Sequence, residues 1–457
     1  MVSTAARIRS SLVLGAAAGT VIAAALMSPR GAAFRPSAGA RSSADGLEVA
    51  ARLVTQRILP GAQTQNLAVT ITAPDLPVDR STGRPPLSLA IVIDRSGSMH
   101  GAPIANARAA ALSMLRQLDG RDAFSVVTYS SAAATVVAMQ RATEANKAAA
   151  RAAIETIDDD GGTCISCGLE TGAAEVARSP IPGGLRRILL ISDGQANEGV
   201  YDRDELATLA AGKAAGGASI STVGVGLDFD ETTMRRLAEV GRGNYYFVED
   251  TVALSAMFGR ELATLSQTVA SDVRLVVTAQ PGVHVEEAYG YPMTRAADSV
   301  VVPVADLRAG ESRKVVLRVT VASPAHGELA IAQVDVGWRR VSDGAQGAAR
   351  TVAMVDVVDD PAAVAASVDP AAMQAVEKAL SARALDDAAA AYDRDGVSAA
   401  RQILERRVQA VRANAAYLGH DTVETIEAAS GNAIDGFARA PAQAKKAASV
   451  SAHELAR

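Results

Sequence analysis

The sequence has few aromatic residues, few cysteines and no excess of basic charge. Aromatic residues occupy only 3% of the 457 positions, so hydrophobic cores must be built from Ala, Val, Leu and Ile. Two cysteines cannot form a disulfide-dense scaffold or a four-thiolate zinc site. The 45 basic and 50 acidic residues give a formal net charge of −5, which offers no basic field for nucleic acid. We therefore expect no nucleic-acid partner.

The composition that remains is that of an ordinary globular protein. Hydrophobic residues account for 49% of the chain and charged residues for 21%. This is enough apolar material for packed cores, and it argues against disorder. At roughly 150 residues per domain, the length suggests about three domains.

Residues 1–30 have the pattern of a secretory signal. Arg7 and Arg9 precede an uncharged, alanine-rich stretch from residue 10 to residue 29, and the small residues at 23–25 offer a cleavage site. The stretch is also about long enough to span a bilayer, so an uncleaved anchor is one alternative and a buried helix is another. We favour cleavage. With or without cleavage, the rest of the chain is expected to be exported to the periplasm, the cell envelope or the medium, and a membrane is reached only if this segment is kept as an anchor.

The middle of the chain alternates strands and helices. Residues 31–47 are rich in Ser, Ala, Gly and Arg and are predicted to be a linker, and the alternation occupies residues 86–268. The predicted strands are Leu87–Ile93, Phe124–Tyr129, Thr135–Met139, Arg186–Ile191, Ser219–Val225 and Asn244–Val248. The predicted helices lie near 103–118, 144–157, 167–178, 202–214, 231–240 and 252–267. This order predicts an α/β fold with a doubly wound, Rossmann-like, mainly parallel sheet that has helices on both faces.

The α/β region is flanked by segments of strand period. Residues 269–360 contain regularly spaced alternating runs and no helices, which predicts a β-sandwich-like domain. Its predicted strands are Val273–Val277, Val283–Glu286, Ser299–Val304, Lys314–Val321, Leu329–Trp338 and Thr351–Val358. Residues 48–85 carry β-like segments but no sheet of their own. We predict that they join the later strands, which makes the α/β region an insertion into the β-domain.

The C-terminal part returns to helical spacing. Residues 361–440 form two apolar-periodic segments with a turn at Asp395-Gly396 between them, which predicts a helical hairpin or small bundle. Residues 441–457 show little pattern and are predicted to be a mobile tail.

Five oxygen-bearing residues stand where three loops of the predicted sheet begin or end. Asp94, Ser96 and Ser98 come directly after the first strand, Thr163 opens a helix after two glycines, and Asp193 follows a later strand. The carboxyl ends of parallel strands meet at one edge, where open α/β sheets bind ligands. We therefore expect these side chains to lie close together.

Two carboxylates and three hydroxyls, without sulfur or imidazole, suit a hard divalent cation. The predicted ion is Mg²⁺, with Mn²⁺ or Ca²⁺ as alternatives. Five side chains leave a coordination position for water or for an incoming carboxylate, so we expect a protein partner that presents Asp or Glu. Taken alone, the Asp-x-Ser-x-Ser segment could instead cap a helix through its hydroxyls.

The motif resembles the metal-ion-dependent adhesion site of the von Willebrand factor type A domain. The family pattern Asp-x-Ser-x-Ser, then Thr, then Asp stands here at Asp94, Ser96, Ser98, Thr163 and Asp193, within a resemblance that covers roughly residues 86–268. The resemblance implies that both serines bind the metal directly and that both aspartates often act through water. It implies that the threonine binds directly or through water, depending on state.

The wider layout resembles bacterial exported proteins that place such a domain between β-strands. It is more loosely similar to inter-alpha-trypsin-inhibitor heavy chains and calcium-activated chloride channel subunits. The helices at 361–440 are not assigned to a family.

Cys164 and Cys167 follow the predicted ligand Thr163 directly. In an exported chain they could form a disulfide that stiffens the loop presenting Thr163, or they could be two buried thiols, and the sequence favours neither. Redox catalysis is disfavoured, because a thioredoxin-like motif needs a different strand-to-helix context.

The leading functional hypothesis is a metal-dependent protein-binding module for adhesion or scaffolding, not an enzyme, with no catalytic residue. The alternatives are a structural or assembly protein of the cell envelope with a stabilising metal, and a metal-assisted hydrolase. No general base stands at a persuasive position; His100 is near the motif but is expected to be solvated. Asp158-Asp159-Asp160 is interpreted as a solvated acidic turn.

Overall fold

A computed structural model describes residues 46–75, 85–181, 184–193, 196–225, 230–248, 259, 267–323 and 326–456. The predicted signal segment, nearly all of the predicted linker and nearly all of the helix predicted near 252–267 lie outside these residues. Among the residues that the structure describes, no helix is both long and apolar enough to span a membrane.

The α/β domain is built on a six-stranded sheet with the order β6-β5-β4-β7-β8-β9. The strands are β4 (Leu87–Asp94), β5 (Ala123–Tyr129), β6 (Ala133–Arg141), β7 (Leu185–Ser192), β8 (Ser219–Val225) and β9 (Arg242–Val248). Only β6 runs antiparallel to its neighbour. All eight residues of β4 are buried, as expected of a central strand with helices on both faces.

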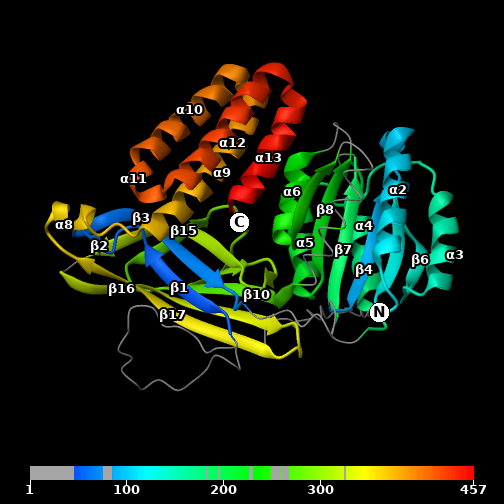
Figure 1. Cartoon of the computed structure of the whole chain (residues 1–457), viewed down its shortest axis with the longest axis horizontal. Helices are drawn as coiled ribbons and strands as arrows, with labels where there is room; N and C mark the ends of the chain where they lie inside the picture. The colour runs from blue at the N-terminus through cyan, green and yellow to red at the C-terminus, as the bar shows by residue number, and fades with distance from the viewer. Residues whose placement is uncertain are drawn as a thin grey trace, which may run out of the picture. The chain divides into compact units, whose positions relative to one another are not determined.

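The helices divide between the two faces of this sheet (Figure 1). They are α2 (Ala102–Gln117), α3 (Glu144–Glu155), α4 (Ile165–Ala177), α5 (Arg203–Ala215) and α6 (Glu231–Val240). Alternate residues of β4 point to opposite faces, so Ile91 packs in the core beneath α2 and α3, whereas Val92 packs beneath α4, α5 and α6. Asp230 caps α6 by accepting hydrogen bonds from the N–H groups of Thr232 and Thr233.

Two sheets, antiparallel except for the short parallel pairing of β2 with β17, pack around a second core to form the β-domain. One has the order β1-β3-β15-β11 and the other β12-β13-β10-β16-β17-β2, with β14 paired to β10. The strands are β1 (Glu48–Leu53), β2 (Arg57–Ile58), β3 (Gly61–Thr72), β10 (Thr268–Ala279), β11 (Val283–Ala288), β12 (Thr294–Ala296), β13 (Ser299–Pro303), β14 (Leu307–Arg308), β15 (Ser312–Ser323), β16 (Gly327–Arg340) and β17 (Gln346–Val357). Because β3 pairs with β15 along its whole length, strands from before and after the α/β domain share one sheet.

The C-terminal part is a bundle of helices. These are α8 (Pro361–Ala365), α9 (Pro370–Asp395), α10 (Val397–Ala413), α11 (Ala415–Leu418), α12 (His420–Arg439) and α13 (Pro441–Ala456). The predicted turn between α9 and α10 is present, with Gly396 at φ +80°. The predicted mobile tail is wrong for Pro441–Ala456, which forms α13. Its buried residues Ala444, Ala448 and Ala452 recur every four positions, and this small-residue face packs against α9 and α12.

Helix α6 of the α/β domain is joined to the C-terminal helices by ion pairs. Arg235 lies 2.8 Å from Asp386 of α9, and Lys446 of α13 lies 3.2 Å from Glu231. Lys446 is 2% exposed, so its charge is neutralised inside the interface. Removing one partner of a buried ion pair destabilises the fold, because the remaining charge is left without compensation.

Glu239 of α6 belongs to the same interface and has an unusual proton affinity. It lies 3.3 Å from Arg235, and 12% of its side chain is exposed. Burial raises the pKa of Glu239 to about 7; Arg235 and Arg236 act to lower this pKa, and Asp386 acts to raise it. The ordinary pKa of a Glu side chain is near 4.5. Between about pH 4.5 and about pH 7, the folded chain therefore keeps a proton on Glu239 that the unfolded chain has released.

The stability of the wild type should therefore fall as pH rises from about 4.5 to about 7. Relative to Glu239→Gln, which cannot ionise, we expect the free energy of unfolding of the wild type to drop by about 2 kcal/mol between about pH 5 and about pH 8.5. Urea unfolding at the two pH values measures this difference. Glu405→Gln is the control, since Glu405 is an exposed carboxyl paired with Arg401. Parallel pH dependences in the wild type and Glu239→Gln would contradict the prediction.

Candidate metal site

The first loop of the candidate site begins where β4 ends. Asp94 is the last residue of β4 and is fully buried, and a short 3₁₀ turn follows at Gly97–Met99. Ser96 stands at the N-cap position of that turn, but its side chain makes no capping hydrogen bond. Its hydroxyl lies 3.1 Å from the hydroxyl of Ser98 instead. The helix-cap alternative for this motif is therefore not what the structure shows.

Asp94 is held by three neutral donors. Its Oδ1 accepts from the Ser96 N–H at 2.8 Å, and its Oδ2 accepts from the hydroxyls of Ser192 at 2.6 Å and Tyr129 at 3.2 Å. Burial raises the pKa of Asp94, and these hydrogen bonds partly oppose the rise. The sequence-based prediction missed Ser192 and Tyr129, although both end strands adjacent to β4.

Ser98 connects the first loop to the loop after β7. Its hydroxyl donates to Oδ1 of Asp193 at 3.0 Å, so Ser96, Ser98 and Asp193 form a continuous chain of side-chain contacts. Ser98 is exposed, whereas Asp193 is 7% exposed. β4 and β7 are the neighbours from which the sheet extends in opposite directions, which is the switch point where α/β sheets bind ligands.

The third loop of the site, which carries Gly161 and Thr163, contacts the first loop through main-chain atoms. The N–H of Gly97 donates to the carbonyl of Gly161 at 2.9 Å, and Gly161 adopts a left-handed conformation with φ +80°. Thr163 is 3% exposed, and its N–H donates to Oδ1 of Asn197 at 2.7 Å. The structure thus joins Asp94, Ser96, Ser98 and Asp193 by hydrogen bonds and brings in the Thr163 loop through its backbone. The role of Asn197 was not predicted.

The donor set fits a hard cation. It consists only of carboxylate and hydroxyl oxygens, and no cationic side chain contacts Asp94 among the described residues. A buried carboxylate with only neutral donors gains from a nearby positive charge. In the described part of the chain, no group of three or more His, Cys, Asp or Glu side chains could hold a metal ion, so a metal here would depend on hydroxyls and water as well as on the two carboxylates.

The three acidic residues at 158–160, beside the site, each contact a neighbouring residue. Asp158 pairs with Arg108 at 2.7 Å, and Asp159 lies 3.2 Å from the exposed ring of His100. The N–H of Asp160 donates to the carbonyl of Arg95 at 2.7 Å, which adds a further tie between the first and third loops. His100 is solvated, as expected, because 85% of its side chain is exposed.

The two cysteines form a disulfide. This decides between the two alternatives that the sequence leaves open. Cys164 is fully buried at the N-cap of α4, and Cys167 is partly exposed in the first turn.

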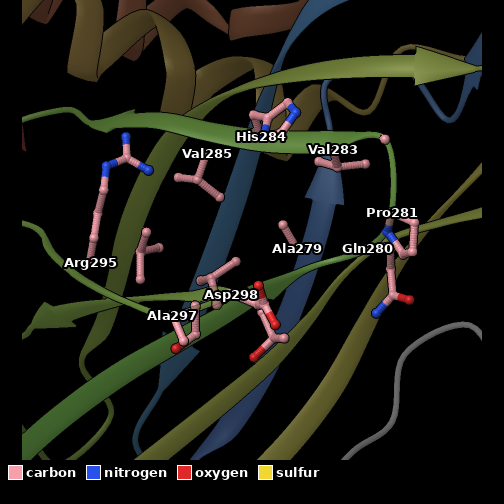
Figure 2. A pocket seen from close by; sticks show the side chains of 14 residues that line it. Ala279, Gln280, Pro281, Val283, His284, Val285, Arg295, Ala297 and Asp298 are labelled. Carbon is pink, nitrogen blue, oxygen red and sulfur yellow. The ribbon is translucent and has the colours of Figure 1, made fainter.

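A separate cavity of about 580 Å³ lies in the β-domain, between β11 and the strands β10, β12 and β13 (Figure 2). Its walls include Val277, Val283 and Val285, with Arg295 at one end. The guanidinium of Arg295 donates to the carbonyl of Glu286 at 3.2 Å. None of these strands carries a residue of the candidate metal site, so the cavity plays no part in it.

Residues 88–260 match the family model of the von Willebrand factor type A domain. A relative from Escherichia coli (strain K12), the uncharacterised protein YfbK, is 31% identical over 217 residues. That match covers 47% of this chain and 37% of the relative, so the chain spans well under half of the relative's length.

Two solved structures are similar to a larger part of the chain. A von Willebrand factor type A protein from Catenulispora acidiphila has a TM-score of 0.66 and 18% identity, over 85% of this chain and 91% of its own. The ArnB paralog VWA2 from Sulfolobus acidocaldarius has a TM-score of 0.61 and 14% identity, over 90% of this chain and 99% of its own. At these identities the similarity concerns the fold alone, and it confirms the predicted fold class.

Proposed function

Residues 88–260 form a von Willebrand factor type A domain, and from this premise we propose that the chain is an exported, metal-dependent protein-binding module. Proteins with this domain are mostly adhesion or scaffold modules, which supports a non-enzymatic role. The observation that carries the proposal is the chain of oxygens from Ser96 through Ser98 to Asp193, beside the buried carboxylate of Asp94.

In this proposal Asp94, Ser96, Ser98, Thr163 and Asp193 hold Mg²⁺, with Mn²⁺ or Ca²⁺ as alternatives. When bound, the ion supplies the positive charge that attracts an Asp or Glu side chain of a protein partner. Ser98 is the exposed member of the set, so the partner would approach from its side. The residues of this chain hold the ion and orient the partner, and they make or break no covalent bond.

Export is part of the proposal. The N-terminal sequence has the pattern of a secretory signal, and the Cys164–Cys167 disulfide is of a kind that persists in oxidising compartments. The expected location is the periplasm, the cell envelope or the medium, with a membrane anchor as the alternative fate of the N-terminal segment.

A peptide-binding experiment tests the proposal. We expect the full chain to bind some peptides that contain Asp, but not the same peptides with Asn, in buffer with Mg²⁺. EDTA should abolish this binding, and Ser98→Ala should weaken it at least about tenfold, because one metal ligand is lost. Ser342→Ala, at an exposed serine of the β-domain, is the matched control. Binding that survives EDTA, or that does not distinguish Asp from Asn, would count against the proposal.

A second candidate function is structural, and the largely buried ion pairs between α6 and the helices α9 and α13 favour it. In that case the metal stabilises the α/β domain inside a cell-envelope assembly. EDTA would then lower the thermal midpoint of the chain while no acidic peptide binds at any Mg²⁺ concentration.

A further inference from the structure

The disulfide lies immediately beside a proposed metal ligand. Cys164 follows Thr163 in the sequence and caps α4, and its Sγ accepts a hydrogen bond from the Cys167 N–H at 3.3 Å. The bridge therefore fixes the first turn of the helix that begins where the third loop of the candidate site ends.

One segment of chain contacts both Thr163 and the sulfur atoms. The carbonyl of Thr163 accepts from the N–H groups of Asn197 at 3.0 Å and Glu198 at 3.3 Å. Gly199, with φ +65°, lies so close to the disulfide that a Cβ on it would overlap Sγ of Cys164. The segment from Asn197 to Gly199 is thus a shared wall between the disulfide and the proposed ligand.

The packing around this wall is tight on the far side as well. The N–H of Val200 donates to the hydroxyl of Ser166 at 3.0 Å, and the Cys164 N–H donates to the carbonyl of Ser130 at 2.7 Å. Cys164 is fully buried, and its Sγ lies 3.4 Å from the hydroxyl oxygen of Ser166. Cys167 is partly exposed and is thus the less buried residue of the pair.

Reduction must disturb this arrangement. Two sulfur atoms without a bond have to move apart to van der Waals contact, and a packed interior accommodates such a change only by local rearrangement. Either the first turn of α4 loosens around Cys167, or the segment carrying Gly199 moves away from Cys164. Both movements act on Thr163, the first through the chain and the second through its two carbonyl hydrogen bonds.

We propose that the Cys164–Cys167 disulfide is a thiol–disulfide exchange site that sets the metal affinity of the adjoining site, with the oxidised chain binding more tightly. This inference rests on the proposed function. The co-reactant is an external dithiol. Its first sulfur attacks Sγ of Cys167, the bond to Sγ of Cys164 breaks, and Cys164 leaves and takes up a proton. The second sulfur of the dithiol then attacks the mixed disulfide. This releases the thiol of Cys167 and an oxidised dithiol, so two electrons pass to the protein.

Calorimetric titration of the full chain with Mn²⁺ tests the inference. The wild type is measured oxidised, and again after reduction by dithiothreitol and its removal without oxygen. We expect the reduced chain to bind at least about fivefold more weakly, at the lower end of typical coupling between sites. The Cys164→Ala/Cys167→Ala variant is the control, and its affinity should be the same before and after the reducing treatment.

The coupling must also act in the other direction. Saturating Mn²⁺ should shift the equilibrium between the disulfide and dithiothreitol toward the protein disulfide by the same factor of about five, or about 20 mV for a two-electron couple. Thiol quantification after equilibration measures this without any partner. Equal or tighter Mn²⁺ binding after reduction overturns the inference and leaves the proposed function intact. An absence of Mn²⁺ binding in both states overturns the proposed function itself.

Discussion

Replacing Asp94 by Asn is expected to lower the affinity of the full chain for Mg²⁺ about 100-fold. The change removes the negative charge and leaves the shape of the side chain intact. Loss of a single group that holds the direct ligands typically lowers the affinity of a site for its metal by roughly 10- to 100-fold. Asp94 is the most deeply buried charge of the set. Calorimetric titration of the wild type and the variant with Mg²⁺ measures the effect.

The variant should fold, because its amide can use the existing partners. The amide oxygen can keep the Ser96 N–H at the position of Oδ1, and the amide nitrogen can donate at the position of Oδ2. There it meets the hydroxyls of Ser192 and Tyr129, which can rotate to accept. Burial raises the pKa of Asp94, so the uncharged side chain should not destabilise the metal-free chain.

Asp343→Asn is the matched control for this experiment. Asp343 is a half-exposed carboxyl in a turn of the β-domain, paired with Arg340. We expect its substitution to leave Mg²⁺ binding unchanged. Should Asp94→Asn bind Mg²⁺ as tightly as the wild type and melt at the same temperature, the carboxylate would have no part in holding the ion.

The α/β fold could be predicted from the sequence because its strands are buried on both faces. Mostly apolar runs are typical of such strands, although the predicted strand Ser219–Val225, which coincides with β8, also contains Ser219, Ser221 and Thr222. The predicted strand Leu87–Ile93 differs from β4 by one residue, Asp94, which is buried with the rest of the strand. The convergence of the loops after β4 and β7 follows from this topology, since the carboxyl ends of these strands share one edge, whereas the loop that carries Thr163 follows helix α3.

The partners of Asp94 were not predictable in the same way. Tyr129 is the residue of β5 that pairs with Asp94, and this pairing depends on the register between parallel strands, which the apolar pattern does not specify. Ser192 ends β7 and is a polar residue at the end of a buried strand. That position was its only signal. A systematic search for polar residues that end neighbouring strands would have found both.

The packing of the C-terminal helices was also beyond the sequence. Alanine contributes little to a hydrophobic pattern, so the face of α13 that carries Ala448 and Ala452 looked featureless although it is buried. Charged residues such as Glu231 and Lys446 are normally solvated, and they become an interface only when two helices meet. Which helices meet is a property of the tertiary structure.

The close approach of α4 to the sheet depends on two glycines. A Cβ on Gly172 would lie 2.7 Å from Cγ2 of Val92, and a Cβ on Gly168 would lie 2.7 Å from the ring of Tyr129. Both neighbours are fully buried and cannot turn toward solvent. The four-residue spacing places both glycines on the face of α4 that packs against the sheet. Glycine at these positions therefore sets the distance from α4 to β4 and holds the Tyr129 ring where its hydroxyl reaches Asp94.

Gly172→Leu is accordingly expected to lower the free energy of unfolding by about 3 kcal/mol or more, because the added side chain has no space against Val92. Urea unfolding followed by circular dichroism measures the loss. Gly212→Leu is the matched control: Gly212 is an exposed residue of α5 with open space around its Cβ position, so the same substitution should stabilise the helix by up to about 1 kcal/mol. Because the two substitutions are expected to change the free energy of unfolding in opposite directions, their comparison separates the effect of packing from that of helix propensity. If both variants were as stable as the wild type, α4 would have room to move outward, and its distance from the sheet would not be what fixes Tyr129 beside Asp94.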